Sequence, residues 1–269
     1  MTTVAAQSAR ARRLALWGAL SGTLLGVVAF APAAWLGTAV RVASAGHVLL
    51  TDATGSVWRG QARLTLTGGA GSRDVLTLPG QLGWGLSISG MALALTLDQP
   101  CCLAQPLRLR IEPGFGRWAL VLPPAAGGIG QWPAAWLSAL GTPWNTLQLS
   151  GVVRLATTGL RMEQVQGRWR LDGAVTADFE QMASRLSTLP RLGSYRVALR
   201  GGGTGADAAT VALSTSAGPL LLAGEGQWSG ARLRFRGEAS AAEGSESALQ
   251  NLLNLLGRRD GARAILLIG

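Results

Sequence analysis

The chain has 269 residues, of which 48% are hydrophobic and only 14% charged, so it is long enough for one large or two small domains with a real core. It carries 24 basic residues, all of them arginine, against 14 acidic residues, which gives a formal net charge of +10. This charge comes without a helix-turn-helix, a zinc-finger spacing or an aromatic ribonucleoprotein motif, so we expect no binding to nucleic acid. A mildly basic body favours contact with anionic headgroups or acidic partner proteins.

The first informative segment is a basic run followed by an apolar one. Arg10, Arg12 and Arg13 lead into residues 14–36, which contain no charged side chain. As a helix with about 1.5 Å rise per residue, this run reaches roughly 34 Å, enough for the approximately 30 Å hydrocarbon core of a bilayer. We therefore predict a cytoplasmic basic tail over 1–13 and a transmembrane helix over 14–36, with the rest of the chain on the far side of the membrane.

A cleavable signal peptide is the alternative for this segment, because small residues near position 30 resemble a cleavage site. The apolar run exceeds the usual signal core of about 7 to 15 residues. Pro32 also follows the first candidate site, where its fixed ring should hinder a protease. We favour an uncleaved anchor, and a mature N-terminus at Pro32 or Ala34 would contradict it.

A short linker over 37–46 leads to a body over 47–269 whose composition predicts β structure. The chain has 38 glycines and ten tryptophans in a background rich in Thr, Val and Leu. Apolar residues alternate with polar ones, as in Leu107, Leu109 and Ile111, which is typical of short strands separated by turns.

One pattern recurs in the body: Trp-x-Gly, then Ala-Arg-Leu, then alternating apolar residues and a closing Gly. It stands at 58–68 and returns, one residue shorter, at 228–237. Looser versions occur at 82–90 and 167–173. We interpret the Gly as a turn or bulge and the Trp as a packing residue at one edge of the core. We therefore predict a curved, largely antiparallel sheet with two related halves, 47–157 and 158–269.

About three short helices are expected to interrupt the sheet. The first covers 132–140 and is bounded by a proline at its first position and a glycine past its end. The second covers 178–189, where Asp178 and Gln181 are spaced as a capping box and a proline ends the helix.

The third helix is predicted at 247–256. It carries four leucines on one stripe, with a glycine as its C-terminal cap: Leu249, Leu252, Leu253 and Leu256. This spacing suits packing on the sheet, and a partner-binding stripe is the alternative.

The two cysteines, Cys101 and Cys102, are adjacent. A disulfide between them would be strained, because neighbouring Cα atoms lie closer than the usual disulfide span. They could instead pair with another chain, or stay reduced and buried. We favour a buried, inert pair, because no CxxC spacing indicates redox chemistry or metal binding.

We find no catalytic constellation in the sequence and expect neither an enzyme nor a cofactor or metal. The only histidine, His47, stands far from any acidic or serine-rich motif, and GxSxG, Walker, HExxH and SxxK motifs are absent. The glycine-rich run 201–205 lacks the dinucleotide fingerprint and predicts a hairpin loop. An enzyme acting on cell-wall glycans stays a third hypothesis, which requires two acids facing each other across a cleft.

Four stretches carry a family resemblance: residues 134–155, 189–203, 213–228 and 248–269. They closely resemble protein N of the bacterial type II secretion system, the general secretion pathway. The most specific element is the run Pro143, Trp144, Asn145, Thr146 and Leu147. The resemblance implies a single-pass inner-membrane protein of Gram-negative bacteria with a periplasmic β-rich domain. It implies an accessory part of the machine that moves folded proteins across the outer membrane, without catalytic residues.

In physical terms the run that begins at Pro143 predicts a turn. Pro143 fixes φ, Trp144 anchors the segment, and the Asn145 side chain caps the turn before Thr146 enters a strand. A partner contact through an exposed Trp144 is the alternative.

Two functions from different classes follow from these observations. The first is a non-catalytic scaffold that binds other secretion components, either the inner-membrane platform or the secretin, and contacts the lipid bilayer through its anchor. The second is a periplasmic lipid-binding or lipid-transfer module whose concave sheet face holds acyl chains. It is suggested by residues 82–97, which place Leu, Ile and Met on one face of the predicted strands.

Overall fold

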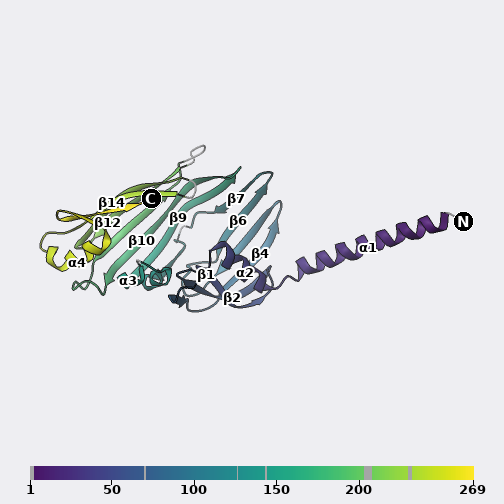
Figure 1. The fold of residues 1–269 in the computed structure, drawn as a ribbon, viewed down its shortest axis with the longest axis horizontal. Coiled ribbons are helices and arrows are strands. Elements are labelled where there is room, and N and C mark those ends of the chain that lie inside the picture. The colour runs from purple at the N-terminus through teal and green to yellow at the C-terminus, as the bar shows by residue number, and fades with distance from the viewer. Residues whose placement is uncertain (1–2, 70, 126, 143, 203–207, 230–231) are drawn as a thin grey trace.

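The computed structural model describes residues 3–69, 71–125, 127–142, 144–202, 208–229 and 232–269 (Figure 1). Within these residues the body is one sheet of sixteen strands, and every neighbouring pair is antiparallel. The prediction of a mainly β, antiparallel body is confirmed.

The strands of the sheet are β1 (Val48–Gly55), β2 (Arg59–Thr67), β3 (Val75–Thr77), β4 (Leu82–Ser89), β5 (Ala92–Asp98), β6 (Leu107–Gly114), β7 (Arg117–Leu122), β8 (Gly130–Pro133), β9 (Leu149–Val165), β10 (Arg168–Ser184), β11 (Gly193–Arg200), β12 (Ala208–Ala217), β13 (Leu220–Ser229), β14 (Arg232–Ala241), β15 (Arg258–Asp260) and β16 (Arg263–Ile268). The helices are α1 (Thr3–Ala29), α2 (Ala33–Ala43), the 3₁₀ helix η1 (Ala134–Leu140), α3 (Trp144–Leu147) and α4 (Glu246–Leu256).

The order of strands in space follows their order in the chain. The path runs β1-β2-β4-β5-β6-β7-β9-β10-β11-β12-β13-β14-β16-β15, with β3 added beside β2 and β8 beside β9. The boundary expected between residues 157 and 158 falls inside β9, one of two 17-residue strands at the middle of the sheet. The sheet therefore continues without a break through the position where two halves were expected to meet.

The N-terminal segment differs from the single helix predicted over 14–36. Helix α1 ends at Ala29, and α2 begins at Ala33 after Pro32. Pro32 lacks the N–H that a continuing helix needs, and its ring would clash with the preceding turn, so the helix cannot run through it. Among the residues that the structure describes, no helix is both long and apolar enough to cross a membrane. Residues 37–43 of the linker predicted over 37–46 belong to α2.

Two of the three short helices are where the sequence predicted them. Of the segment 132–140, residues 134–140 form η1, a 3₁₀ helix preceded by Pro133 and followed by Gly141 at φ 83°, while residues 132 and 133 end β8. The segment 247–256 forms α4. The glycine after α4, Gly257, is extended at φ −174° instead of left-handed, because the chain turns at once into β15.

The helix predicted over 178–189 is wrong, because residues up to Ser184 continue β10. The Asp178 carboxylate accepts a 2.6 Å hydrogen bond from Nε of Arg196 on β11 instead of capping a helix. Gln181 lies in a bulge at φ 52°, which brings Met182 into the core. Cross-strand pairing and burial thus outweigh the local capping pattern.

Three apolar clusters form the core, all where helices or loops cover the sheet. The largest joins α4 to β10, β11, β13, β14 and β16, the second joins α2 to β2 and β4, and the third joins η1 to the segment that follows β3 and the loop that follows β5. Helix α2 lies over the N-terminal strands and α4 over the C-terminal strands, while η1 and α3 pack near the start of β9 and the end of β10 (Figure 1). None of the three clusters contains a residue of β6 or β7.

Candidate functional site: the apolar concave face

The register of the strands sorts side chains onto two chemically different faces. One row of directly paired residues crosses five strands: Leu93 on β5, Ile111 on β6, Leu120 on β7, Met162 on β9 and Leu171 on β10. All five are apolar and only half-buried. Because side chains alternate between faces along each strand, rows two residues away point to the same side.

A second apolar row crosses the C-terminal part of the sheet. It runs from Ala177 on β10 through Val197 and Leu213 to Gly224 on β13. A Cβ atom added to Gly224 would overlap the ring of Phe235, so that glycine makes room for an aromatic side chain lying across β13. We call the face that carries both rows the apolar concave face.

The opposite face is polar and rich in arginine. The row adjacent to Leu93 contains Arg110 on β6, Arg161 on β9 and Asp172 on β10. Ion pairs across strands hold this face together, such as Arg161 Nη1 to Glu112 Oε2 at 2.8 Å. The positive charge of the body is therefore spread over the outer surface of the sheet.

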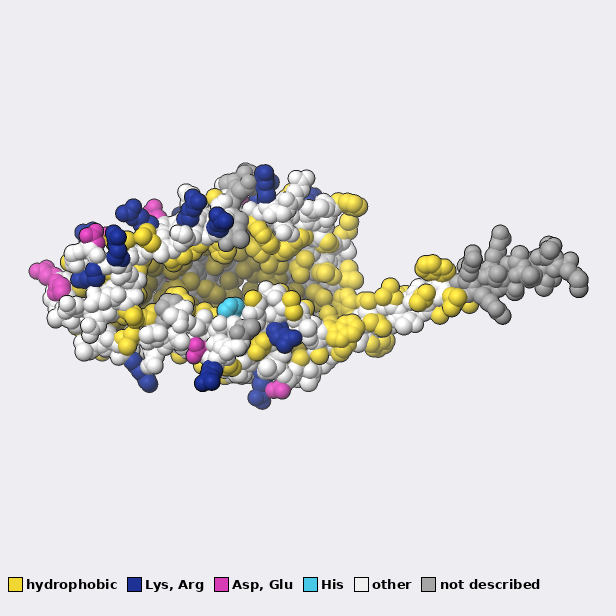
Figure 2. All heavy atoms as spheres, in the orientation of Figure 1, with side chains coloured by type: hydrophobic (Ala, Val, Ile, Leu, Met, Phe, Trp, Pro, Cys, Tyr) yellow, Lys and Arg dark blue, Asp and Glu magenta, His cyan; other side chains and the backbone are white. Residues whose placement is uncertain are grey.

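Figure 2 shows the concave face as a trough lined by hydrophobic side chains between two rims. The core clusters close the parts of this face beneath α2, η1 and α4. Where no helix lies above the sheet, the same kind of side chain stays half-exposed, as at Leu120 and Met162. Isolated exposed apolar residues are ordinary on soluble proteins, but a continuous apolar surface marks a binding site.

The residues predicted at the turn after Pro143 are brought together in α3, and Pro143 itself lies outside the described residues. Asn145 does not cap its own turn. Its Nδ2 donates to Oδ2 of Asp74 at 2.9 Å, tying α3 to the segment before β3, and Thr146 Oγ1 donates to Asn145 Oδ1 at 3.2 Å. Trp144 is 38% exposed, so its ring remains accessible to a partner.

The leucine stripe of α4 faces inward. Leu249, Leu252 and Leu253 are at most 2% exposed and belong to the largest core cluster, and Leu256 packs against it. The packing interpretation of this stripe is the one that the structure supports, and these four side chains are not a free surface for a partner.

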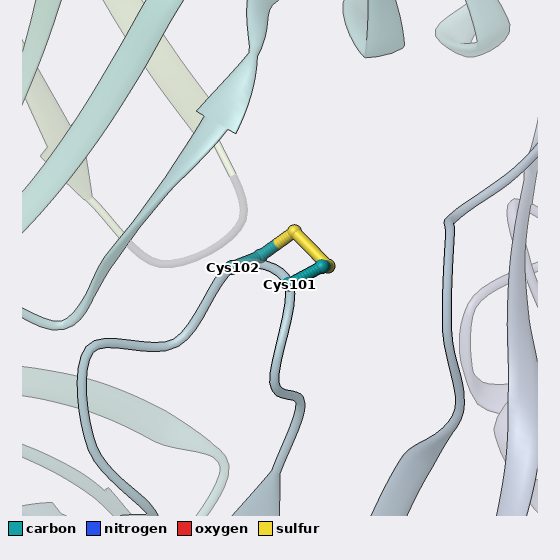
Figure 3. The surroundings of a disulfide bond; sticks show 2 residues. All are labelled: Cys101 and Cys102. Atoms are coloured by element: carbon teal, nitrogen blue, oxygen red, sulfur yellow. A yellow bond between two sulfur atoms is a disulfide. The ribbon is translucent and has the colours of Figure 1, made fainter.

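Cys101 and Cys102 are joined to each other by a disulfide in the loop between β5 and β6 (Figure 3). A disulfide between the two neighbours was a possibility that the sequence left open, and the favoured pair of unlinked thiols is wrong. Only Cys102 is buried, against Trp136 of η1, while Cys101 is exposed. The backbone carbonyl of Cys102 accepts a 2.8 Å hydrogen bond from the N–H of Gln131 on β8, which fixes the loop to the sheet.

The two acidic residues in the cavity near this loop do not face each other across a cleft as a glycosidase pair would. A cavity of about 670 Å³ is lined by Asp178 and Glu180 together with the disulfide. Both acids come from β10, and each forms an ion pair, with Arg196 and Arg154 respectively. Over the described part of the chain, no cluster of three or more His, Cys, Asp or Glu is placed to hold a metal ion.

Two predictions fall partly outside the described residues. The glycine-rich hairpin loop expected at 201–205 connects β11 and β12, and residues 203–205 are not among those described. The second copy of the Trp-x-Gly pattern spans the end of β13 and the start of β14, with residues 230 and 231 likewise outside.

These features define a class of protein: a single antiparallel sheet with an arginine-rich outer face and an apolar concave face, joined to an N-terminal helix. The chain matches the family model described as type II secretion system (T2SS), protein N, over residues 46–267, and it belongs to that family. The resemblance noted in the sequence is confirmed. No curated protein and no solved structure gave a significant match.

Family membership gives the chain a role in type II secretion. This family is an accessory component of the secretion system and is not known as a family of enzymes. As such a component, the protein works with other parts of the secretion system at a membrane-associated location.

Proposed function

We propose that this protein is a non-catalytic accessory subunit that the N-terminal helix holds at the inner membrane, with the sheet acting as a scaffold for other secretion components. Membership of the protein N family supports the assignment to this machine. The helix supports the assignment to the membrane, because α1 projects from the body (Figure 1) with large apolar side chains in the open. Trp17, Leu24 and Leu25 are 66% to 72% exposed.

Such exposure is unfavourable in water and favourable in a bilayer. Moving a fully exposed leucine or valine side chain into an apolar phase is worth about 1.5 to 3 kcal/mol. In this proposal α1 enters the inner membrane, the basic segment 1–13 stays on the cytoplasmic side, and the body 47–269 lies in the periplasm. Accessibility of an engineered cysteine at Ser216, on the body, to a membrane-impermeant thiol reagent in whole cells tests this orientation.

Capture from crosslinked cells tests the scaffold. A photoreactive amino acid at Trp144, the partly exposed first residue of α3, should recover an inner-membrane platform protein or the secretin. The same group at Ser216, an exposed residue near the far end of β12, serves as the matched control. Recovery of no secretion component from either site, or from the unsubstituted protein with a general crosslinker, would contradict the scaffold.

The concave face favours a second function, the binding of lipid acyl chains. The five-strand row from Leu93 to Leu171 spans roughly 19 Å at about 4.8 Å between strands. One acyl chain crosses about 15 Å, half of the roughly 30 Å hydrocarbon core. The row is therefore long enough for one chain, and each methylene removed from water is worth about 0.8 kcal/mol. The half-buried row is the observation that carries this candidate.

Two neighbouring residues of β7 give a matched test of lipid binding. Leu120 lies in the apolar row, whereas Val121 lies on the outer face, paired with Arg110 and Arg161. Leu120→Glu places a carboxylate in the trough, and Val121→Glu places one between two arginines. Native mass spectrometry of the detergent-extracted protein should find phospholipid on the unsubstituted chain and on Val121→Glu, and less on Leu120→Glu. No bound phospholipid on the unsubstituted protein would contradict this function.

A further inference from the structure

Two neighbouring hairpins end in large apolar side chains that nothing covers. The β4–β5 hairpin carries Ile88, 71% exposed, and Met91, 90% exposed. The β6–β7 hairpin carries Phe115, which is fully exposed. We call these three side chains the apolar tips.

The residues at the tips are unusual for tight hairpin turns, because they are apolar. The pairs Ser89 with Ala92 and Gly114 with Arg117 leave two-residue loops, Gly90–Met91 and Phe115–Gly116. The glycines have positive φ, 63° and 66°, as tight hairpin turns require. The other loop position normally carries a polar residue, as the next hairpin shows with Gln166–Gly167 between β9 and β10. Met91 and Phe115 are therefore not needed to form their turns.

Two hydrogen bonds connect α1 to β4, the strand that leads to the first tip. Trp58 Nε1 donates to the carbonyl oxygen of Val28 in α1 at 2.8 Å. The Leu86 N–H donates to the Trp58 carbonyl oxygen at 2.7 Å, two residues before Ile88. Figure 1 shows α1 leaving the body at the end toward which β4 and β6 point. The apolar helix and the apolar tips therefore share one end of the molecule.

The surroundings of the tips suit the headgroup region of a bilayer. Trp118 and Trp169, near the tips of β7 and β10, meet edge to face with ring centroids 5.2 Å apart, and both are half-buried. Tryptophan gathers at membrane interfaces, because its ring is apolar and its N–H is polar. Arg117 follows the β6–β7 tip and is exposed, where its guanidinium can contact lipid phosphates.

We infer that the apolar tips insert into the surface of the bilayer that α1 enters, so that the body rests on the membrane at two places. We favour a lipid surface over a protein partner, because the tips lie at the same end of the molecule as the apolar helix α1. Figure 2 also shows apolar side chains at the end of the body that adjoins the helix, where a membrane surface would lie. The inference rests on the membrane location in the proposed function. It adds a contact that fixes the tilt of the body and turns one end of the trough toward the lipid.

Site-specific fluorescence tests the contact in the full-length protein. The native cysteines are bonded to each other, so single cysteines introduced as Met91→Cys or Phe115→Cys react alone with an environment-sensitive label when no reductant is present. The labelled protein is reconstituted into vesicles of phosphatidylethanolamine and phosphatidylglycerol, with or without lipids that carry a quencher. Ser216→Cys, exposed near the far end of β12, is the matched control, and Leu20→Cys on α1 reports the helix.

We expect labels at Met91 and Phe115 to shift to the blue, brighten several-fold and be quenched by the lipid-borne quencher, while the Ser216 label stays in water. Labels at both tips that stay in water, with the Leu20 label in lipid, would overturn the inference and leave the anchor intact. Quenched tips with an unquenched Leu20 label would support the tip contact and contradict the proposed role of α1. A crosslink from Phe115 to a secretion protein, with tips unquenched in vesicles, would also overturn the inference.

Discussion

Leu249 in α4 gives the sharpest test of how this fold is held together. None of its side chain is exposed, and it lies in the cluster that joins the helix to the sheet. Leu249→Ala removes buried methyl groups and leaves a cavity, which in protein cores costs about 2 to 5 kcal/mol. Leu255 on the same helix is 50% exposed, so Leu255→Ala makes the same chemical deletion at little cost, within about 0.5 kcal/mol.

The two variants should therefore differ by about 3 kcal/mol in free energy of unfolding, roughly a hundredfold change in the folding equilibrium at about 1.4 kcal/mol per tenfold. Equilibrium urea unfolding in detergent, followed by tryptophan fluorescence, measures this difference from the shift in midpoint. The chain has ten tryptophans to report it. A shift for Leu249→Ala no larger than that for Leu255→Ala would refute the placement of α4 in the core and return its leucine stripe to the set of partner surfaces.

Three further predictions concern a glycine with positive φ, the ionisation of the tyrosine and the disulfide. Gly173→Ala should lower the free energy of unfolding by about 1 to 3 kcal/mol, because Gly173 has φ +95° and an added Cβ would overlap the neighbouring strand. Burial raises the pKa of Tyr195, the only tyrosine, so its contribution to stability is present below its ordinary pKa of about 10 and falls as pH rises above it. Replacing both Cys101 and Cys102 by serine should cost only about 1 kcal/mol, because their disulfide closes the shortest possible loop.

Each has its own check. Gly85→Ala is the control for Gly173, since its Cβ would meet open space, and equal effects of the two would contradict the steric reason. Absorbance near 295 nm should show no tyrosinate while the protein stays folded, and a normal titration near pH 10 would contradict the burial of Tyr195. Tyr195→Phe should keep full stability at pH 7, because the phenol oxygen has no hydrogen-bond partner among the described residues. A loss of several kcal/mol in the double serine variant would mean that the disulfide holds more than its own loop.

The strands and two helices could be predicted because their signals are local. Alternation in segments such as Leu107–Ile111 reports directly on side chains that leave a strand on opposite sides. Pro133 and Gly141 bound η1 by backbone geometry alone, and the leucine spacing of α4 records the face that it buries. The run around Trp144 and Asn145 identified the family. The hydrogen bond from Asn145 to Asp74, far away in the sequence, has no local signal.

The sequence offered an apolar concave face as one hypothesis but could not decide whether that face is open, because alternation does not tell a covered apolar face from an exposed one. Leu64 packs beside η1 and Leu120 stays half-exposed, yet both follow the same pattern in their strands. Only the placement of helices over the sheet distinguishes them. The capping pattern at Asp178 and Gln181 failed for a related reason, since strands β9 and β11 on both sides supplied stronger partners. The tips do have a local signal, because Met91 and Phe115 each stand beside a turn glycine. The signal is weak, since a single apolar residue in a loop does not by itself indicate a membrane contact.

The near-sequential order of the strands has a consequence for how the chain acquires its structure. Apart from β3, β8 and the final pair, each strand lies beside the strand that comes just before it in the chain. Most pairing contacts therefore close short loops. A new hairpin can add to an edge that is already formed, without waiting for a distant part of the chain. The sheet can therefore grow in one direction from its N-terminal strands, with β16 and β15 added last beside β14 and α4 packing on the face of the sheet.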